Sequence, residues 1–273
     1  MTPPEADLHP DLVALLADPR LALTRPPPGA SLAAFRQAAD GYLARTPRPE
    51  LETVEDAIVD GPGGSLALRL YHAPSRPREG VVLFVHGGGF VFGNLETHDA
   101  LCRSVAIGSG MTVVAVDYRL APEHPYPAGL HDTLAALSWV RARLTPKAMA
   151  IVGDSAGAQI ATAAALSSAR EEAPVQALGL LYPCVDPRRE TASQRRFETG
   201  HMLTGDFLDW AWRAYAGDQD RSADPMFDLN LADLGVLPST ILVTAGHDPL
   251  RDEGLALGRR IHEAGVDLSS RHY

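Results

Sequence analysis

The stretch MAIVGDSAG at residues 149–157 decides the fold, together with the run AQIATAAALS at 158–167 that follows it. The apolar residues 149–152 are typical of a buried strand, and the alanine-rich run is typical of a buried helix. Gly153 and Gly157 flank Ser155, where side chains would collide with neighbouring backbone. A strand that turns abruptly into a helix holds this serine in a strained conformation, with its hydroxyl exposed beside the positive end of the helix. The pattern therefore predicts a nucleophilic serine at position 155.

A second motif, HGGGF at residues 86–90, directly follows the strand-like run 81–85. Acyl transfer creates a negatively charged oxygen that backbone N–H groups stabilise, and side chains would block their approach. A glycine run after a strand suits that task, although a flexible turn also tolerates glycines. The run does not match the G-x-G-x-x-G pattern of dinucleotide loops.

Outside these motifs, short β-rich runs alternate with helical segments from about residue 52 onward. Several of these runs are continuously apolar, which indicates a mostly parallel sheet covered by helices, and so an α/β fold. The predicted strands are residues 66–71, 81–85, 112–116, 148–152, 177–182 and 240–244. Residues 11–16 and 31–44 read as helices, the second capped by Ser31. Residues 186–225 carry no strand pattern and are predicted to be a helical insertion over the carboxyl edge of the sheet.

Composition excludes several classes of protein. The 273 residues include 34 acidic and 24 basic side chains, a net charge of −10 that disfavours nucleic-acid and membrane-surface partners. A single lysine, Lys147, removes a P-loop lysine and most Schiff-base schemes. Cys102 and Cys184 are too few for a disulfide framework or a zinc site, although one bridge remains an alternative. The sequence shows neither a signal peptide nor a membrane span, so we expect a soluble, cytoplasmic protein.

Two further stretches, DYRLAPEHPYPA at 117–128 and DPLRDE at 248–253, complete a set of four ordered motifs. With them the chain resembles the hormone-sensitive-lipase-like group of α/β-hydrolases, the bacterial family IV carboxylesterases, from about residue 5 to the last residue. The resemblance implies a mostly parallel eight-stranded sheet with a helical cap. It divides the chain into N-terminal cap helices at 1–45, a hydrolase core at 46–185 and 226–273, and a cap insertion at 186–225.

The resemblance also assigns roles within the motifs. Ser155 is the nucleophile, and the N–H groups of the oxyanion hole come from Gly88, Gly89 and Ala156. Supporting positions in the same motifs are His86, Gly87 and Asp154. Asp248 is the acid that orients a catalytic histidine. The residues themselves favour Asp248, which follows a strand and comes after Ser155 in the chain; Asp252 is the alternative, although it suits the start of the helix predicted at 253–264.

A serine hydroxyl needs a base to attack an ester. The resemblance places this histidine in a His-Gly-Phe-like motif a few residues after a tyrosine that ends the last strand, a position that Tyr273 matches. The third triad member is therefore expected beyond Tyr273, and residues 1–273 alone are expected to be impaired. His272 is a substitute that we do not favour, because a strand residue points to a sheet face.

The sequence thus predicts a serine carboxylesterase that hydrolyses small esters through an acyl-enzyme, and the resemblance implies short-to-medium acyl chains. No cofactor and no metal are expected, since no pair of histidines has metal-ligand spacing. The resemblance also implies that the terminal strand at 267–273 lies at a sheet edge and mediates a homodimer. Phe90, Phe92 and Leu203 are candidates for the pocket wall. Alternatives are a ligand-binding protein on a catalytically incomplete hydrolase scaffold and a related acyl-transfer enzyme.

Overall fold

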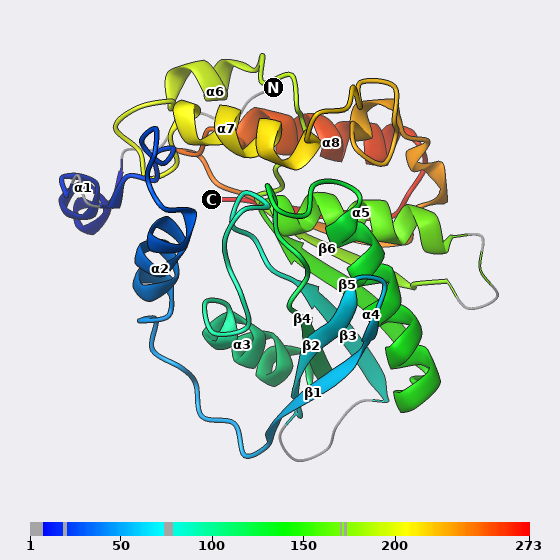
Figure 1. Ribbon diagram of the computed structural model, residues 1–273. Helices are drawn as coiled ribbons and strands as arrows, with labels where there is room; N and C mark the ends of the chain where they lie inside the picture. Colours follow the sequence, from blue (N-terminus) through cyan, green and yellow to red (C-terminus); the bar gives the residue numbers. More distant parts are fainter. Residues whose placement is uncertain (1–7, 19–20, 74–78, 170, 172–173) are drawn as a thin grey trace.

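One mostly parallel sheet organises the molecule (Figure 1). The computed structural model describes residues 8–18, 21–73, 79–169, 171 and 174–273. The strand order is β1-β2-β4-β3-β5-β6-β7-β8; β1, β2 and β4 pair antiparallel, and all other neighbours pair parallel. The strands are β1 (Val54–Gly61), β2 (Gly64–Tyr71), β3 (Gly80–Val85), β4 (Thr112–Val116), β5 (Ala148–Asp154), β6 (Ala177–Leu181), β7 (Ser239–Thr244) and β8 (Leu268–His272). This confirms the predicted α/β-hydrolase sheet.

Burial explains which strands the sequence reveals. Every described residue of β3, and all but the first of β4, is buried, because helices cover both faces of the sheet there. β1 was not predicted, because it lies at the sheet edge, none of its residues is fully buried, and its sequence VEDAIVDG is half polar. Its place follows from a tight turn, in which Gly61 and Gly64 pair across residues 62–63.

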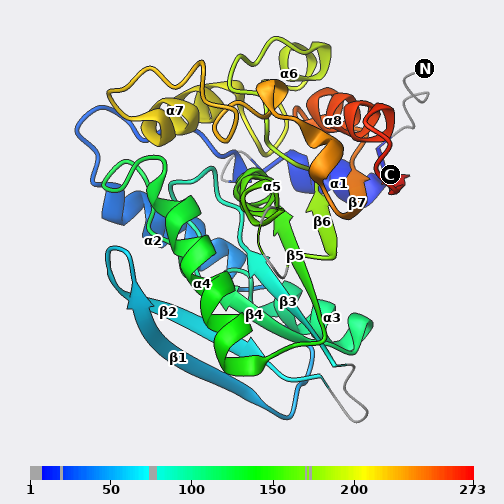
Figure 2. The same ribbon diagram turned by 90° about the vertical axis from the view of Figure 1, so that its right-hand side faces the viewer.

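The two faces of the sheet carry different helices (Figure 2). On one face, α4 (Ala128–Leu144), α5 (Ala156–Ser168) and α8 (Arg251–Glu263) pack on inward residues such as Leu83 and Ile151. On the other face, α3 (Asp99–Ser109) packs on Val82 and Phe84. Alternate residues of one strand thus serve two cores, which explains the continuous apolar runs.

The remaining helices lie over the carboxyl edge of the sheet. They are α1 (Pro10–Leu16), α2 (Leu32–Leu43), α6 (Ala192–Arg196) and α7 (Gly205–Ala216), with single turns η2 (Leu229–Leu231) and η3 (Leu234–Val236) leading into β7. Ser31 caps α2 by accepting a hydrogen bond from the Ala34 amide, as predicted. Phe35 of α2 and Phe207 of α7 pack in one small core with Phe92. The exact boundaries between cap and core stay a prediction.

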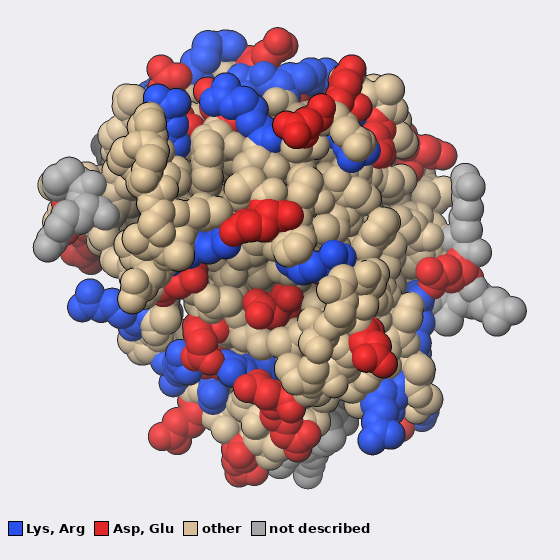
Figure 3. Space-filling model, viewed as in Figure 1, with Lys and Arg blue, Asp and Glu red and all other residues tan. Residues whose placement is uncertain are grey.

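The described residues include no helix that is both long and apolar enough to span a membrane. Both cysteines are free and buried: Cys102 lies on α3, and Cys184 follows β6. On the face shown in Figure 3, acidic and basic side chains are intermixed around uncharged surface.

Candidate active site

Ser155 stands at the turn between β5 and α5, with φ 51° and ψ −121°. Such a conformation costs a non-glycine residue on the order of 1–3 kcal/mol, so the surroundings must impose it. The Ser155 amide donates to the Leu181 carbonyl, and the Ser155 carbonyl accepts from the Cys184 amide. The neighbouring β6 and its exit loop therefore hold the turn on both sides.

The flanking glycines are required, as the sequence indicated. A Cβ on Gly153 would lie 2.4 Å from the carbonyl oxygen of Gly157, and a Cβ on Gly157 would lie 2.1 Å from the carbonyl oxygen of Val85. Both distances are far below van der Waals contact. Helix α5 can therefore begin directly against the end of β3 only without these side chains, and this close approach aims Ser155 toward the glycine loop.

The glycine loop adopts conformations that side chains disfavour. Gly88 has φ 117° and Gly89 has φ 58°, and both line the same cavity as Ser155. A Cβ on Gly88 would lie 2.1 Å from the carbonyl oxygen of Phe92. Ala156 is the first residue of α5, and the first N–H groups of a helix have no carbonyl partner within the helix. Three backbone N–H groups from two elements are thus available beside the serine.

Asp154 connects the elbow to the glycine loop. One oxygen of its buried carboxylate accepts from the Gly87 amide at 2.9 Å. His86 is also buried; its ring stacks on Tyr118 with 4.3 Å between centroids, and its Nδ1 lies 2.8 Å from the Gly87 carbonyl. Burial first, and then the nearby His98, lower the pKa of His86 to about 3, so its imidazole is neutral. His86, Gly87 and Asp154 therefore support the loop.

Asp248 lies in the loop after β7 and lines the cavity with Ser155. Burial raises its pKa to about 6, although the Leu250 amide donates to its carboxylate at 2.8 Å and thereby opposes the shift. Asp252 has different neighbours: its carboxylate accepts from the Ser193 amide at 2.8 Å and from Nε of Arg251 at 2.9 Å. Asp252 therefore fastens the cap helix α6 to α8. It lies in the first turn of α8, which begins at Arg251 rather than at the predicted residue 253.

Four histidines line the cavity: His9, His201, His247 and His272. His201 and His247 stack nearly parallel, with 6.4 Å between ring centroids. His272 ends β8, and its Nδ1 lies 2.9 Å from the hydroxyl of Thr244 on β7. Burial lowers the pKa of His272. Its ring is thus engaged with the neighbouring strand. Among the described residues, no group of three or more histidine, cysteine or acidic side chains is arranged to hold a metal ion.

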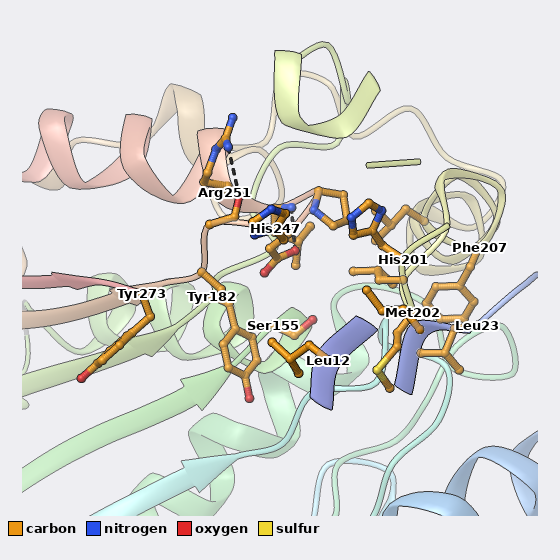
Figure 4. Close-up of a pocket in the computed structure, with 18 of the residues that line it drawn as sticks. Leu12, Leu23, Ser155, Tyr182, His201, Met202, Phe207, His247, Arg251 and Tyr273 are labelled. Atoms are coloured by element: carbon orange, nitrogen blue, oxygen red, sulfur yellow. Dashed lines mark hydrogen bonds between the residues drawn. The ribbon is translucent and has the colours of Figure 1, made fainter. Parts of the chain in front are cut away.

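The cavity has a volume of about 960 Å³ and is mostly apolar. Figure 4 shows Leu23 and Met202 on the side of Ser155 opposite Tyr273, and Leu12 also lines the cavity. Phe92 and Leu203 line it as expected, whereas Phe90 does not: its buried ring stacks on Tyr215 with 3.8 Å between centroids. A positive φ of 66° turns Phe90 away from the loop and into the core, which sequence alone does not reveal.

Sequence reasoning missed Tyr182, which lines the cavity beside Ser155. It directly follows β6, the parallel neighbour of β5, and its φ of 37° marks a second sharp turn at the same edge. Burial raises its pKa. Its position at the carboxyl end of a predicted strand was the signal that could have found it.

A family model described as alpha/beta hydrolase fold matches residues 82–273. The chain belongs to this family. The esterase LipI of Mycobacterium tuberculosis is 39% identical over 83% of this chain and 74% of its own length. The carboxylic ester hydrolase LipN of the same organism is 36% identical over 83% of this chain and 64% of its own length.

Solved structures agree with this assignment. A hyperthermophilic esterase from the archaeon Pyrobaculum calidifontis superposes with a TM-score of 0.89 at 33% identity, over 98% of this chain and 89% of the esterase. The predicted membership of the hormone-sensitive-lipase-like group of hydrolases is thereby confirmed.

Proposed function

We propose that this α/β-hydrolase is a serine carboxylesterase that hydrolyses small esters with short-to-medium acyl chains. The observation that carries the proposal is the strained Ser155, which shares one cavity with Gly88, Gly89 and Asp248. Similarity to proteins named as esterases supports the same activity. The cavity volume of about 960 Å³ lies at the upper end of the ordinary range for small-molecule sites, and its apolar wall suits an acyl chain.

In the proposed reaction, the Ser155 hydroxyl attacks the ester carbonyl while a histidine takes its proton. The N–H groups of Gly88, Gly89 and Ala156 hold the negatively charged oxygen of the tetrahedral intermediate. The histidine returns the proton to the departing alcohol, and water then releases the acyl group from Ser155. Asp248 accepts from the histidine, which fixes its orientation and stabilises its charge after proton transfer.

We propose that this histidine follows Tyr273. The Tyr273 amide donates to the Thr244 carbonyl, and the Gly246 amide donates to the Tyr273 carbonyl at 2.5 Å. Tyr273 is thus bonded to Gly246, which precedes Asp248 by two residues in the loop after β7. A chain that continues past Tyr273 therefore leaves the sheet beside the loop that carries Asp248. His272 supports this choice, because Thr244 already engages its Nδ1 on the strand.

The test compares hydrolysis of p-nitrophenyl butyrate by residues 1–273 and by the same chain extended with a His-Gly-Phe-type tail. We expect the extended chain to be faster by several orders of magnitude, because an incomplete triad leaves roughly 10³–10⁴-fold catalysis over water. Ser155→Ala in the extended chain removes the attacking hydroxyl, and is expected to abolish the gain. Equal turnover by both chains would instead assign the base to a residue within 1–273.

Two finer proposals concern the setting of the enzyme. We propose a cytoplasmic location, supported by the two free thiols.

We also propose a homodimer through β8, which lies at the end of the sheet order with an unpaired edge among the described residues. Light scattering after gel filtration would report the mass of a monomer if the dimer proposal is wrong.

A further inference from the structure

His98 contacts Asp154, the residue that links the turn at Ser155 to the glycine loop. It precedes α3, and only 11% of its side chain is exposed. Its Nε2 lies 3.3 Å from one oxygen of Asp154, whose other oxygen accepts from the Gly87 amide at 2.9 Å. One carboxylate thus joins the imidazole to the first N–H of the glycine loop.

The other ring nitrogen of His98 contacts a hydroxyl that has two further polar partners. Nδ1 lies 2.8 Å from the hydroxyl of Thr97, which also lies 2.8 Å from the Asn94 carbonyl and accepts from the Asn94 amide at 2.9 Å. A hydroxyl has a single proton to donate. When that proton goes to the Asn94 carbonyl, Nδ1 must donate to the hydroxyl while Nε2 donates to Asp154. This arrangement satisfies every group, and it requires an imidazolium.

The surrounding charges favour the same state. Burial lowers the pKa of His98, but the carboxylates of Asp154 on β5 and Asp40 on α2 outweigh it, so the pKa is raised overall. His86, at the end of β3, faces His98 with 5.4 Å between ring centroids and is neutral, as described above. The Cys102 thiol near Asp154 has a strongly raised pKa and also stays uncharged.

The same network reaches the cap. Asp40 of α2 accepts from the Gly93 amide at 3.1 Å and from the side-chain amide of Asn94 at 3.0 Å. Asn94 in turn accepts from the Thr97 amide at 3.1 Å. The loop that starts at Gly87 is therefore held at both ends by a carboxylate, one from the elbow and one from the cap, with His98 between them.

We infer that His98 is a positioning residue for the oxyanion hole: as an imidazolium it fixes Asp154, and through Asp154 it fixes the Gly87 end of the loop that presents Gly88 and Gly89. The inference rests on the proposed function for its effect on catalysis. It identifies an ion pair that touches neither substrate nor the catalytic histidine. Oxyanion donors act only within a narrow distance range, so a loosened loop reduces stabilisation of the transition state more than binding of the ester.

The first test is structural and needs no turnover. Nitrogen-15 NMR of the histidine rings in residues 1–273 is expected to show His98 titrating above the ordinary histidine pKa of about 6.5. Asp154→Asn is expected to lower the pKa of His98. Hydrogen exchange at the Gly87 amide is expected to be about tenfold faster in His98→Ala than in wild type. A neutral His98 at pH 6, or unchanged exchange at Gly87, would overturn the inference.

The second test uses the extended chain and p-nitrophenyl butyrate. We expect His98→Ala to lower kcat about tenfold with KM within about twofold. We expect His98→Gln, which keeps a donor without a charge, to recover part of kcat. We also expect wild-type kcat to fall at alkaline pH as the imidazolium is lost, and His98→Gln to lack that step. His262→Gln on the exposed face of α8 is the matched control, expected to behave as wild type.

The two tests separate the possible failures. If Ser155 in the extended wild-type chain does not turn over ester, the proposed function fails, while NMR and exchange at Gly87 still decide whether His98 holds the loop. If wild type turns over and His98→Ala retains kcat, the positioning role is wrong and the esterase proposal stands.

Discussion

Replacing Gly88 by alanine should disable the oxyanion hole while leaving the rest of the fold in place. The added Cβ would lie 2.1 Å from the backbone oxygen of Phe92, where ordinary contacts begin at 3.4 Å. The φ of 117° at Gly88 is also one that an L-residue rarely adopts. Since the obstacle is backbone rather than the tip of a side chain, the loop must move by about 1 Å.

A displacement of that size takes the Gly88 N–H out of hydrogen-bond range. Loss of one oxyanion donor lowers kcat by about 10²–10³-fold, or roughly 2.7–4 kcal/mol. Gly89→Ala should be milder, about tenfold, because its Cβ meets the ring of Phe207 at 2.6 Å rather than backbone, and its φ of 58° is within the left-handed helical region.

The assay is hydrolysis of p-nitrophenyl butyrate by the extended chain, with circular dichroism to confirm folding. The matched control is Gly108→Ala on α3, where an added Cβ meets no heavy atom within 4 Å and alanine favours the helix by about 1 kcal/mol. We expect the control to keep wild-type kcat and melt slightly later. A folded Gly88→Ala enzyme with kcat within threefold of wild type would refute the assignment of this loop.

Three further predictions follow from the same structure. Asp248→Asn should lower kcat by about 10⁴-fold. Asp252→Asn should mainly lower the melting temperature, because it weakens the hydrogen bond that joins α6 to α8. Comparable kcat values for the two variants would contradict the choice of Asp248 as the acid. Burial raises the pKa of Glu253 to about 8, above its unfolded value near 4.5. The folded protein therefore binds the proton more tightly, and the contribution of Glu253 to the free energy of unfolding should fall as pH rises from 4.5 to 8. Urea titrations of Glu253→Gln should show a weaker fall over this range. Arg36→Ala should destabilise the protein by about 1–3 kcal/mol, because Arg36 binds the Val91 carbonyl and Glu123, whereas Arg25→Ala, which breaks an exposed pair, should change the free energy of unfolding by under about 1 kcal/mol.

Much of the fold could be predicted because burial leaves a direct trace in the sequence. Strands covered on both faces, such as β3, read as continuous apolar runs. The turn at Ser155 could be predicted because steric exclusion fixes glycine on both sides of it. β1 was not predicted because an edge strand with exposed residues does not need a continuous apolar sequence.

The candidate site was predictable only where a motif marks it. Ser155 and the glycine loop follow from local sterics. The placement of Tyr182 depends on which strand neighbours β5, and the inward turn of Phe90 depends on a single dihedral angle. The bonds from His98 to Asp154, and from Asp40 to Asn94, join residues more than fifty positions apart, and no local pattern encodes them.

The central claim is that Ser155 is a nucleophile, and covalent labelling tests it most directly. The extended chain is incubated with a fluorophosphonate, with and without excess butyrate ester, and the modified peptide is located by mass spectrometry. We expect one adduct on the peptide that contains Ser155, slowed by the ester and absent in Ser155→Ala. Unlabelled protein, or an adduct on another residue, would contradict the account.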